Sequence, residues 1–231
     1  MMICNEYKVK IMDKVRELEN LVTTSSEILE NLIKAGKRPL TVIHTWLARG
    51  AATSLCITLR ALEPSRYCEI VPAELFTYYI SPYDEGYESN LIIFSAPGQE
   101  SSLLRLLMAS RLTGHNLVLI APSLDRVTKH YLYGASVIEI PDPNLFWLFS
   151  TMLAIRAPYL YASSKIKTSR IERLGKEVRD YSSIVMELFN IYSHQISELQ
   201  KNIEKASRII ISSSQSMICL LYTSPSPRDL S

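Results

Sequence analysis

Five short apolar runs, each followed by a segment with helical periodicity, constrain the fold of this chain more than any other feature. The runs are Leu40 to His44, Tyr67 to Val71, Asn90 to Phe94, Asn116 to Ile120 and Ser136 to Ile140. The segments between them are long enough for crossover helices, and the candidates are Ala48 to Leu62, Ala73 to Ile80, Glu100 to Leu112 and Asp125 to Tyr133. Strands that alternate with helices form a parallel sheet covered on both faces. The pattern therefore predicts one doubly wound α/β domain between Arg38 and Tyr161.

Helical patterns also flank this core. From Glu6 to Ala35, apolar residues recur every three or four positions, which predicts an amphipathic helix, either continuous or restarted at Ser25 or Ser26 as an N-cap. An apolar helix is expected from Pro143 to about Leu160. Beyond a polar break, the same periodicity predicts one long helix from Thr168 to Lys205 with a single apolar stripe, which needs a packing partner.

The C-terminal end is unusual. Arg208 to Ile211 and the serine-rich Ser212 to Ser216 resemble a further strand and a hydroxyl-rich turn, as at the start of a second α/β unit. The residues from Cys219 to Asp229 resemble the conceptual translation of a sequencing-library adapter; a natural disordered terminus is the alternative.

We therefore expect the native gene to continue past about Met217. The sequence also predicts five segments along the chain. Residues 1–37 are a helical extension, 38–161 the α/β domain, 162–206 a long connecting helix, 207–218 the start of a truncated second domain and 219–231 an adapter-derived tail.

Charge and hydropathy exclude several classes of function. The formal net charge is +2, from 25 basic and 23 acidic residues, and it provides no basic surface for nucleic acid. No apolar stretch reaches the roughly 20 residues that a spanning helix needs, and the N-terminus lacks the apolar core of a signal peptide. The sequence predicts a cytoplasmic protein without a membrane partner.

The four cysteines give no sign of a metal or disulfide site. Cys4, Cys56, Cys68 and Cys219 lie far apart and show no CxxC spacing. We expect unpaired cysteines that pack as small hydrophobic residues, no structural metal and no cofactor.

The segment after the third predicted strand has the composition of an anion site. Asn90-Leu-Ile-Ile-Phe-Ser-Ala-Pro-Gly-Gln-Glu-Ser-Ser102 reads as a strand, a Ser95/Gly98 turn and a helix start. Ligands of open parallel sheets bind beyond the carboxyl ends of the strands, where helix N-termini offer unpaired N–H groups. A glycine also lets the backbone approach a phosphate closely. Ordinary N-capping of the helix is the alternative interpretation.

This segment, with Pro72-Ala-Glu-Leu-Phe76 before it and Gly114-His-Asn-Leu-Val-Leu-Ile120 after it, resembles the sugar isomerase (SIS) domain. The likeness covers about Arg38 to Leu160 and is to the first half of a tandem-SIS protein, such as the isomerase part of glucosamine-6-phosphate synthase. It implies a five-stranded parallel flavodoxin-like sheet, a phosphosugar ligand and a homodimer. Ser95 and Gly98 fall on the first serine and the glycine of the family's phosphate loop.

The resemblance implies a phosphosugar site made of Ser95, Gly98, Gln99, Glu100, Ser101, Ser102 and Arg49. Arg49 lies near the first helix N-terminus, with an ordinary surface arginine as the alternative. The family's second hydroxyl-rich turn, Gly-Thr-Ser, falls on Trp46-Leu47-Ala48, which supply no hydroxyl. Catalytic residues cannot be assigned, because the family's acid–base groups lie largely in the second domain and the C-terminal tail.

Two functions remain in competition. The first is part of an aldose–ketose or aminosugar-phosphate isomerase, inactive in this form. The second is a non-catalytic SIS module that senses a phosphosugar or serves as a dimer scaffold. A nucleotide-binding Rossmann domain is disfavoured, since Thr45-Trp-Leu-Ala-Arg-Gly50 replaces the glycine-rich motif after the first strand.

Overall fold

The computed structural model describes residues 2–35, 40–84, 90–132, 134–165, 167–178 and 181–205 of the chain. The chain divides into two compact units: Val22–Gly175 form one, and the segments up to Leu21 and from Lys176 onward form the other. The predicted strand at Arg208 to Ile211 and the adapter-like tail lie outside the described residues.

The first unit is built on a five-stranded, all-parallel sheet in the order β2-β1-β3-β4-β5. The strands are β1 (Leu40–His44), β2 (Cys68–Pro72), β3 (Asn90–Phe94), β4 (Asn116–Pro122) and β5 (Ser136–Ile140). Chain order reverses between β1 and β3, which pair from Leu40↔Asn90 to His44↔Phe94. The predicted α/β fold class is confirmed.

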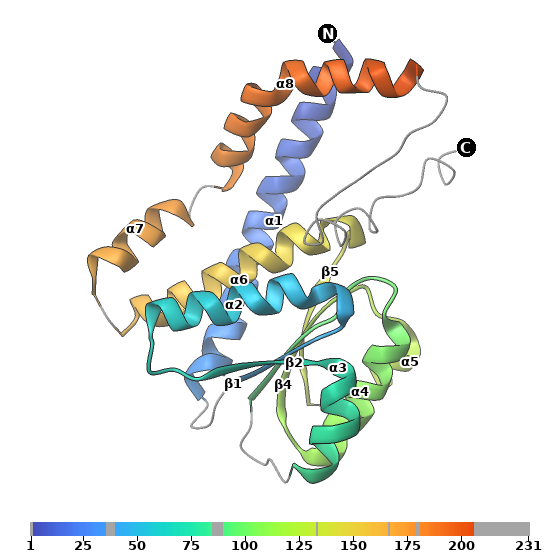
Figure 1. Ribbon diagram of the computed structural model, residues 1–231, viewed down its shortest axis with the longest axis vertical. Coiled ribbons are helices and arrows are strands. Elements are labelled where there is room, and N and C mark those ends of the chain that lie inside the picture. Colours follow the sequence, from blue (N-terminus) through green and yellow to red (C-terminus); the bar gives the residue numbers. More distant parts are fainter. Residues whose placement is uncertain are drawn as a thin grey trace. The chain divides into compact units, whose positions relative to one another are not determined.

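Helices cover both faces of this sheet (Figure 1). On one face lie α2 (Arg49–Leu62), which follows the short 3-10 helix η1 (Trp46–Ala48), and α6 (Phe146–Ser163), which follows η4 (Pro143–Leu145). On the other face lie α3 (Ala73–Leu75), which continues into η2 (Phe76–Ile80) and η3 (Ser81–Tyr83), together with α4 (Glu100–Thr113) and α5 (Arg126–His130). Successive strand residues point to opposite faces. Ile43, Leu91, Ile93 and Leu119 pack in one cluster with leucines of α4, while α2 contacts β1 and β3 and α6 contacts β4.

The predicted N-terminal helix is α1 (Met2–Ala35), and of the two alternatives it is the continuous one, without a restart at Ser25 or Ser26. The Ser26 hydroxyl donates to the carbonyl oxygen of Val22, four residues earlier, and thus acts inside the helix and not as a cap. The last turn of α1 is tied to the sheet, because Asn90 Nδ2 donates to the Leu32 carbonyl oxygen at 2.7 Å and Arg66 donates to that of Ile33 at 2.8 Å.

The predicted helix from Thr168 to Lys205 is two helices, α7 (Ser169–Glu177) and α8 (Tyr181–Lys205). Ile171 and Leu174 of α7 pack with Leu62 and Ala162 in the first unit, whereas the chain from Lys176 onward belongs to the second. The helix is interrupted where the chain changes its packing partners.

Cys56 and Cys68 form a disulfide, so the prediction of unpaired cysteines is wrong for this pair. The helix α2 packs on β2 and brings the two Cα atoms to 5.5 Å, although the residues stand 12 apart in sequence. Both cysteines are buried. Spacing alone did not indicate the pair, because the contact is tertiary.

None of the helices described is long and apolar enough to cross a membrane.

Candidate functional site

The Ser95 turn, residues Ser95 to Gln99, follows β3 at the carboxyl edge of the sheet. It lies beside the end of β1, at the point where strand order reverses. In open parallel sheets this reversal leaves a crevice between the two diverging connections, in which ligands bind. The structure therefore brings the predicted segment to the edge that strand polarity required.

Three backbone donors hold the base of this turn. The N–H of Thr45 donates to the Phe94 carbonyl oxygen at 3.0 Å, and the N–H of Ser95 donates to that of Ile120 at 2.9 Å. The N–H of Ala96 donates to the Thr45 hydroxyl at 3.0 Å. Thr45 is fully buried and Ser95 nearly so. The loops after β1 and β3 are thus joined to each other, and the loop after β3 is also joined to strand β4.

Thr45 is a positioning residue that sequence reasoning missed. Its place directly after a predicted strand, in the loop that faces the Ser95 turn, was the available signal. No local pattern showed that its hydroxyl reaches residue 96, because 51 residues separate the two groups.

Gly98 supplies the left-handed position of the turn. Its φ is +76°, and no heavy atom lies within 4 Å of where a Cβ would stand. Gln99 then caps α4, whose first turn is closed by the bond from Leu103 N–H to the Gln99 carbonyl oxygen at 3.0 Å. Glu100 and Ser101 are exposed and Ser102 is half-buried on this first turn. The open space beside Gly98 therefore adjoins the N-terminus of α4, where backbone N–H groups can bind an anion.

Two carboxylates accept hydrogen bonds within this segment. Glu100 Oε1 accepts from the Gly98 N–H at 3.2 Å. Glu74 Oε1, at the start of the connection after β2, accepts from the Ser102 hydroxyl at 2.9 Å. A negative group is favoured at a helix N-terminus, so Glu100 occupies the position that an anionic ligand would take. Glu74 was not among the predicted site residues.

The His44 side chain lies at the same edge of the sheet, and charges at this edge affect its pKa. His44 ends β1, is 4% exposed, and its Nδ1 lies 3.1 Å from the Thr45 carbonyl oxygen. Burial lowers the pKa of His44 from its ordinary value of 6.5 and is the largest effect. The hydrogen bond to Thr45 raises this pKa, the charge of Arg49 lowers it, and the charge of Glu74 raises it. Arg49 and Glu74 therefore both act on this edge, Arg49 from the exposed start of α2.

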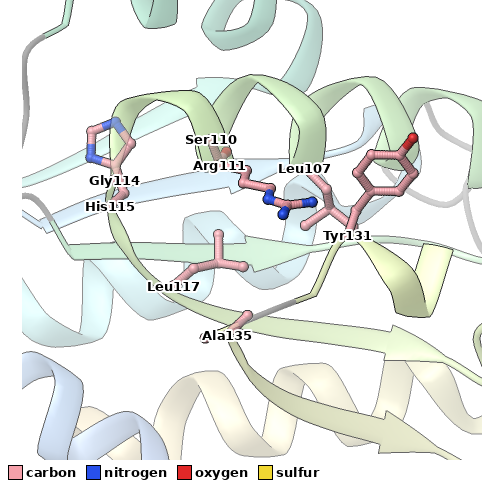
Figure 2. Close-up of a pocket in the computed structure, with 9 residues that line it drawn as sticks. Leu107, Ser110, Arg111, Gly114, His115, Leu117, Tyr131 and Ala135 are labelled. Atoms are coloured by element: carbon pink, nitrogen blue, oxygen red, sulfur yellow. The ribbon is translucent and has the colours of Figure 1, made fainter.

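A separate pocket lies at the opposite edge of the sheet and is shown in Figure 2. Its volume is about 160 Å³, and Arg111 reaches into it from α4 toward Leu107 and Tyr131. His115, at the entry to β4, has a fully buried side chain and lies 3.5 Å from the Asp84 carboxylate. None of the predicted phosphosugar residues lines this pocket. Among the described residues, no group of three or more His, Cys, Asp or Glu side chains could hold a metal ion.

No protein-family model matches the chain, and no curated protein matches its sequence. Solved structures do match. A Clostridium difficile protein described as a phosphosugar isomerase superposes with a TM-score of 0.57 and 13% identity over 87% of this chain and 57% of that one. The C-terminal domain of glucosamine-fructose-6-phosphate aminotransferase from Francisella tularensis superposes with a TM-score of 0.51 and 12% identity over 66% of this chain and 43% of that one. An Escherichia coli protein in complex with a phosphosugar superposes with a TM-score of 0.50 and 11% identity over 73% of this chain and 97% of that one.

At 11–13% identity, this likeness shows the fold, which is that of sugar isomerase domains. The chain spans 57% of the length of the C. difficile protein and 43% of the F. tularensis chain.

Proposed function

We propose that this chain, which has the fold of a sugar isomerase domain, binds a phosphorylated sugar at the Ser95 turn. The observation that carries the proposal is the position of this turn: it joins β3 to the N-terminus of α4 at the strand-order reversal, with Gly98 in a left-handed conformation. A concave run of backbone N–H groups at a helix start is a binding site for anions.

The names of the similar structures support the choice of ligand. One neighbour is described as a phosphosugar isomerase, and another was solved with a phosphosugar bound. In this proposal the phosphate accepts from the Gly98 N–H and from the N-terminus of α4. Ser95 and Ser101 are hydroxyl donors, and Ser102 becomes one when its hydroxyl leaves Glu74 Oε1. The Gln99 amide donates beside them, and Arg49 neutralises charge.

Binding requires that Glu100 gives up its hydrogen bond to Gly98. The Glu100 side chain is exposed and can turn into solvent, where its carboxylate is fully hydrated. The exchange replaces one anion by another at the same donors. We therefore expect affinity to be modest and to rise when the charge of Glu100 is removed.

For the whole protein we propose part of an aldose–ketose or aminosugar-phosphate isomerase that acts in the cytoplasm as a homodimer. In this proposal residues 38–161 bind the sugar phosphate, 162–206 connect, and 207–218 begin a second domain that is cut short before the adapter-like tail. No catalytic residue is assigned.

A non-catalytic sensor or dimer scaffold is the second candidate. It is favoured by residues 46–48, which form a 3-10 helix without a side-chain hydroxyl after β1, with the Trp46 side chain 76% exposed. It is favoured also by Pro97, which has no N–H to offer in the turn.

Titration calorimetry of the full chain tests the proposal. Glucosamine 6-phosphate, fructose 6-phosphate and arabinose 5-phosphate are compared with the unphosphorylated sugars and with inorganic phosphate. We expect binding of at least one phosphosugar, weaker binding of inorganic phosphate and none of the free sugars. Equal binding of a free sugar and its phosphate, or no binding of any phosphosugar at millimolar concentration, would contradict the proposal.

A further inference from the structure

One large aromatic residue is left open to solvent beside the Ser95 turn. Trp46 is the first residue of η1 and is 76% exposed, whereas Thr45 before it and Ala48 after it are fully buried. The indole is therefore not part of the core that holds this edge of the sheet together. A large aromatic side chain that the fold leaves in water is typical of a surface that contacts a ligand.

The backbone brings Trp46 close to the Ser95 turn. Thr45, its neighbour in the chain, donates its N–H to the Phe94 carbonyl oxygen at 3.0 Å, and its hydroxyl accepts from the Ala96 N–H at 3.0 Å. Consecutive Cα atoms lie about 3.8 Å apart, so the Cα of Trp46 is within roughly 10 Å of the Ala96 nitrogen. A hexose phosphate held at the turn and an indole side chain together cover this distance.

The two connections at the strand-order reversal differ in chemistry. They leave the sheet on opposite faces, with α4 after β3 on one face and α2 after β1 on the other (Figure 1). The first connection offers the Ser95 turn and the backbone N–H groups at the start of α4. The second begins with Trp46, Leu47 and Ala48, which have no hydroxyl. A ligand between the two connections has hydrogen-bond donors on one side and an aromatic residue on the other, as is usual in small-molecule sites.

We propose that the Trp46 indole stacks on the ring of a hexose or aminohexose 6-phosphate whose phosphate binds at the Ser95 turn. This inference rests on the proposed function and narrows its ligand to the cyclic form of the sugar. A pyranose ring presents a face of C–H groups, and the negative face of an aromatic ring attracts such weakly positive groups. An open-chain sugar has no flat face of this kind, so Trp46 favours the ring over the open chain.

Titration calorimetry of the full chain tests the stacking with three probes. They are glucosamine 6-phosphate, its open-chain alditol 2-amino-2-deoxyglucitol 6-phosphate, and inorganic phosphate. Trp46→Ala should weaken the binding of glucosamine 6-phosphate about fivefold, while Trp46→Phe, which keeps an aromatic face, should retain most of the affinity. The affinity for inorganic phosphate should not change, because phosphate alone does not reach the indole. The wild type should prefer the cyclic sugar to the alditol, and Trp46→Ala should bind the two equally.

Tyr83→Ala is the matched control. Tyr83 is an aromatic residue that is 85% exposed, and its neighbour Asp84 lies 3.5 Å from His115 at the entry to β4, at the opposite edge of the sheet. This variant should bind all three probes like the wild type, and circular dichroism should show that every variant is folded.

Fluorescence provides a second, independent readout. The chain has two tryptophans, Trp46 and Trp147, and Trp147 is half-buried on α6. In Trp147→Phe all tryptophan emission comes from Trp46. Glucosamine 6-phosphate should move this emission to shorter wavelength, because stacking removes water from the indole, and inorganic phosphate should not.

The outcomes separate this inference from the proposed function. Binding of glucosamine 6-phosphate that Trp46→Ala leaves unchanged, with constant Trp46 emission, would overturn the stacking and leave the phosphate site standing. Equal losses of affinity for the sugar phosphate and for inorganic phosphate would show that Trp46 supports the turn itself, which also overturns the stacking. A wild-type chain that binds no phosphosugar would overturn both proposals.

Discussion

At the scale of single residues, the Ser95 turn depends on the conformation of one glycine and on the charge of one glutamate. Gly98 has a φ that residues with a Cβ adopt at a cost of roughly 1–2 kcal/mol. Glu100 accepts the hydrogen bond of Gly98 and places a negative charge where the proposed phosphate binds. The geometry of the site therefore depends on Gly98 and its charge on Glu100, so a single substitution can change one without the other.

Gly98→Val should abolish phosphosugar binding and leave the fold mostly intact, because the β-branched side chain forces the turn out of its left-handed conformation. Gly134→Val is the matched control, since Gly134 also has a positive φ, of +81°, and also has no atom within 4 Å of an added Cβ. Calorimetry should show binding lost only in the first variant. Unchanged affinity in Gly98→Val would contradict the site.

Glu100→Gln should strengthen phosphosugar binding severalfold, because removing one charge about 4 Å from a phosphate relieves a repulsion of about 1 kcal/mol or more. The gain should shrink at high salt. Glu69→Gln, at an exposed position of β2, is the control and should change little. Weaker binding in Glu100→Gln would mean that the carboxylate contacts the sugar, contrary to the role assigned to it.

His44 should make the chain less stable as pH falls through the histidine range. Burial lowers its folded pKa below the value of 6.5 in the unfolded chain. Between the two values the unfolded state binds more protons, so the free energy of unfolding increases with pH and is lost as pH falls below about 6.5. Urea titrations at pH 5 and pH 7.5 should show a smaller difference for His44→Gln than for the wild type. Equal pH dependence in the two proteins would exclude this effect.

At the scale of elements, the contact between α6 and α7 ends the first unit. Gly175 in the last turn of α7 faces the Tyr159 side chain of α6: an added Cβ would collide with its hydroxyl oxygen and lie 2.9 Å from its Cζ. The helix therefore carries a glycine although alanine is intrinsically favoured in helices by about 1 kcal/mol. Close approach of the two helices explains this choice.

Gly175→Ala should lower the free energy of unfolding by about 1–3 kcal/mol, the usual cost of overpacking. Tyr159→Phe in the same chain should recover part of the loss, since it removes the nearest atom. Gly50→Ala on α2 is the control and should be neutral or stabilising, because no atom lies within 4 Å of its added Cβ. Denaturant unfolding of the four proteins measures these differences, and a stabilised Gly175→Ala would show that Tyr159 moves aside freely.

At the scale of the whole molecule, the described residues have the α/β fold of sugar isomerase domains, and the chain spans 57% of the C. difficile protein that shares this fold. We expect the 231-residue chain to have no isomerase activity, because the resemblance places the acid–base groups largely in a second domain. Turnover of fructose 6-phosphate or glucosamine 6-phosphate by the purified chain would refute this. Activity in an extended gene product alone would support it, and phosphosugar binding without activity in both would favour the sensor or scaffold.

The sequence by itself determined the elements and the edge at which the candidate site lies. The limits of β1, β3 and β5 agree with prediction, because each is a short apolar run bounded by polar or turn residues. The position of the Ser95 turn followed from strand polarity, since all carboxyl ends of a parallel sheet meet at one edge.

Tertiary structure alone decided which distant groups meet. The bond from Ala96 to the Thr45 hydroxyl, the Cys56–Cys68 disulfide and the contact between Ser102 and Glu74 join residues 51, 12 and 28 positions apart. Local preferences act over a few neighbouring residues, whereas such contacts depend on how whole elements pack.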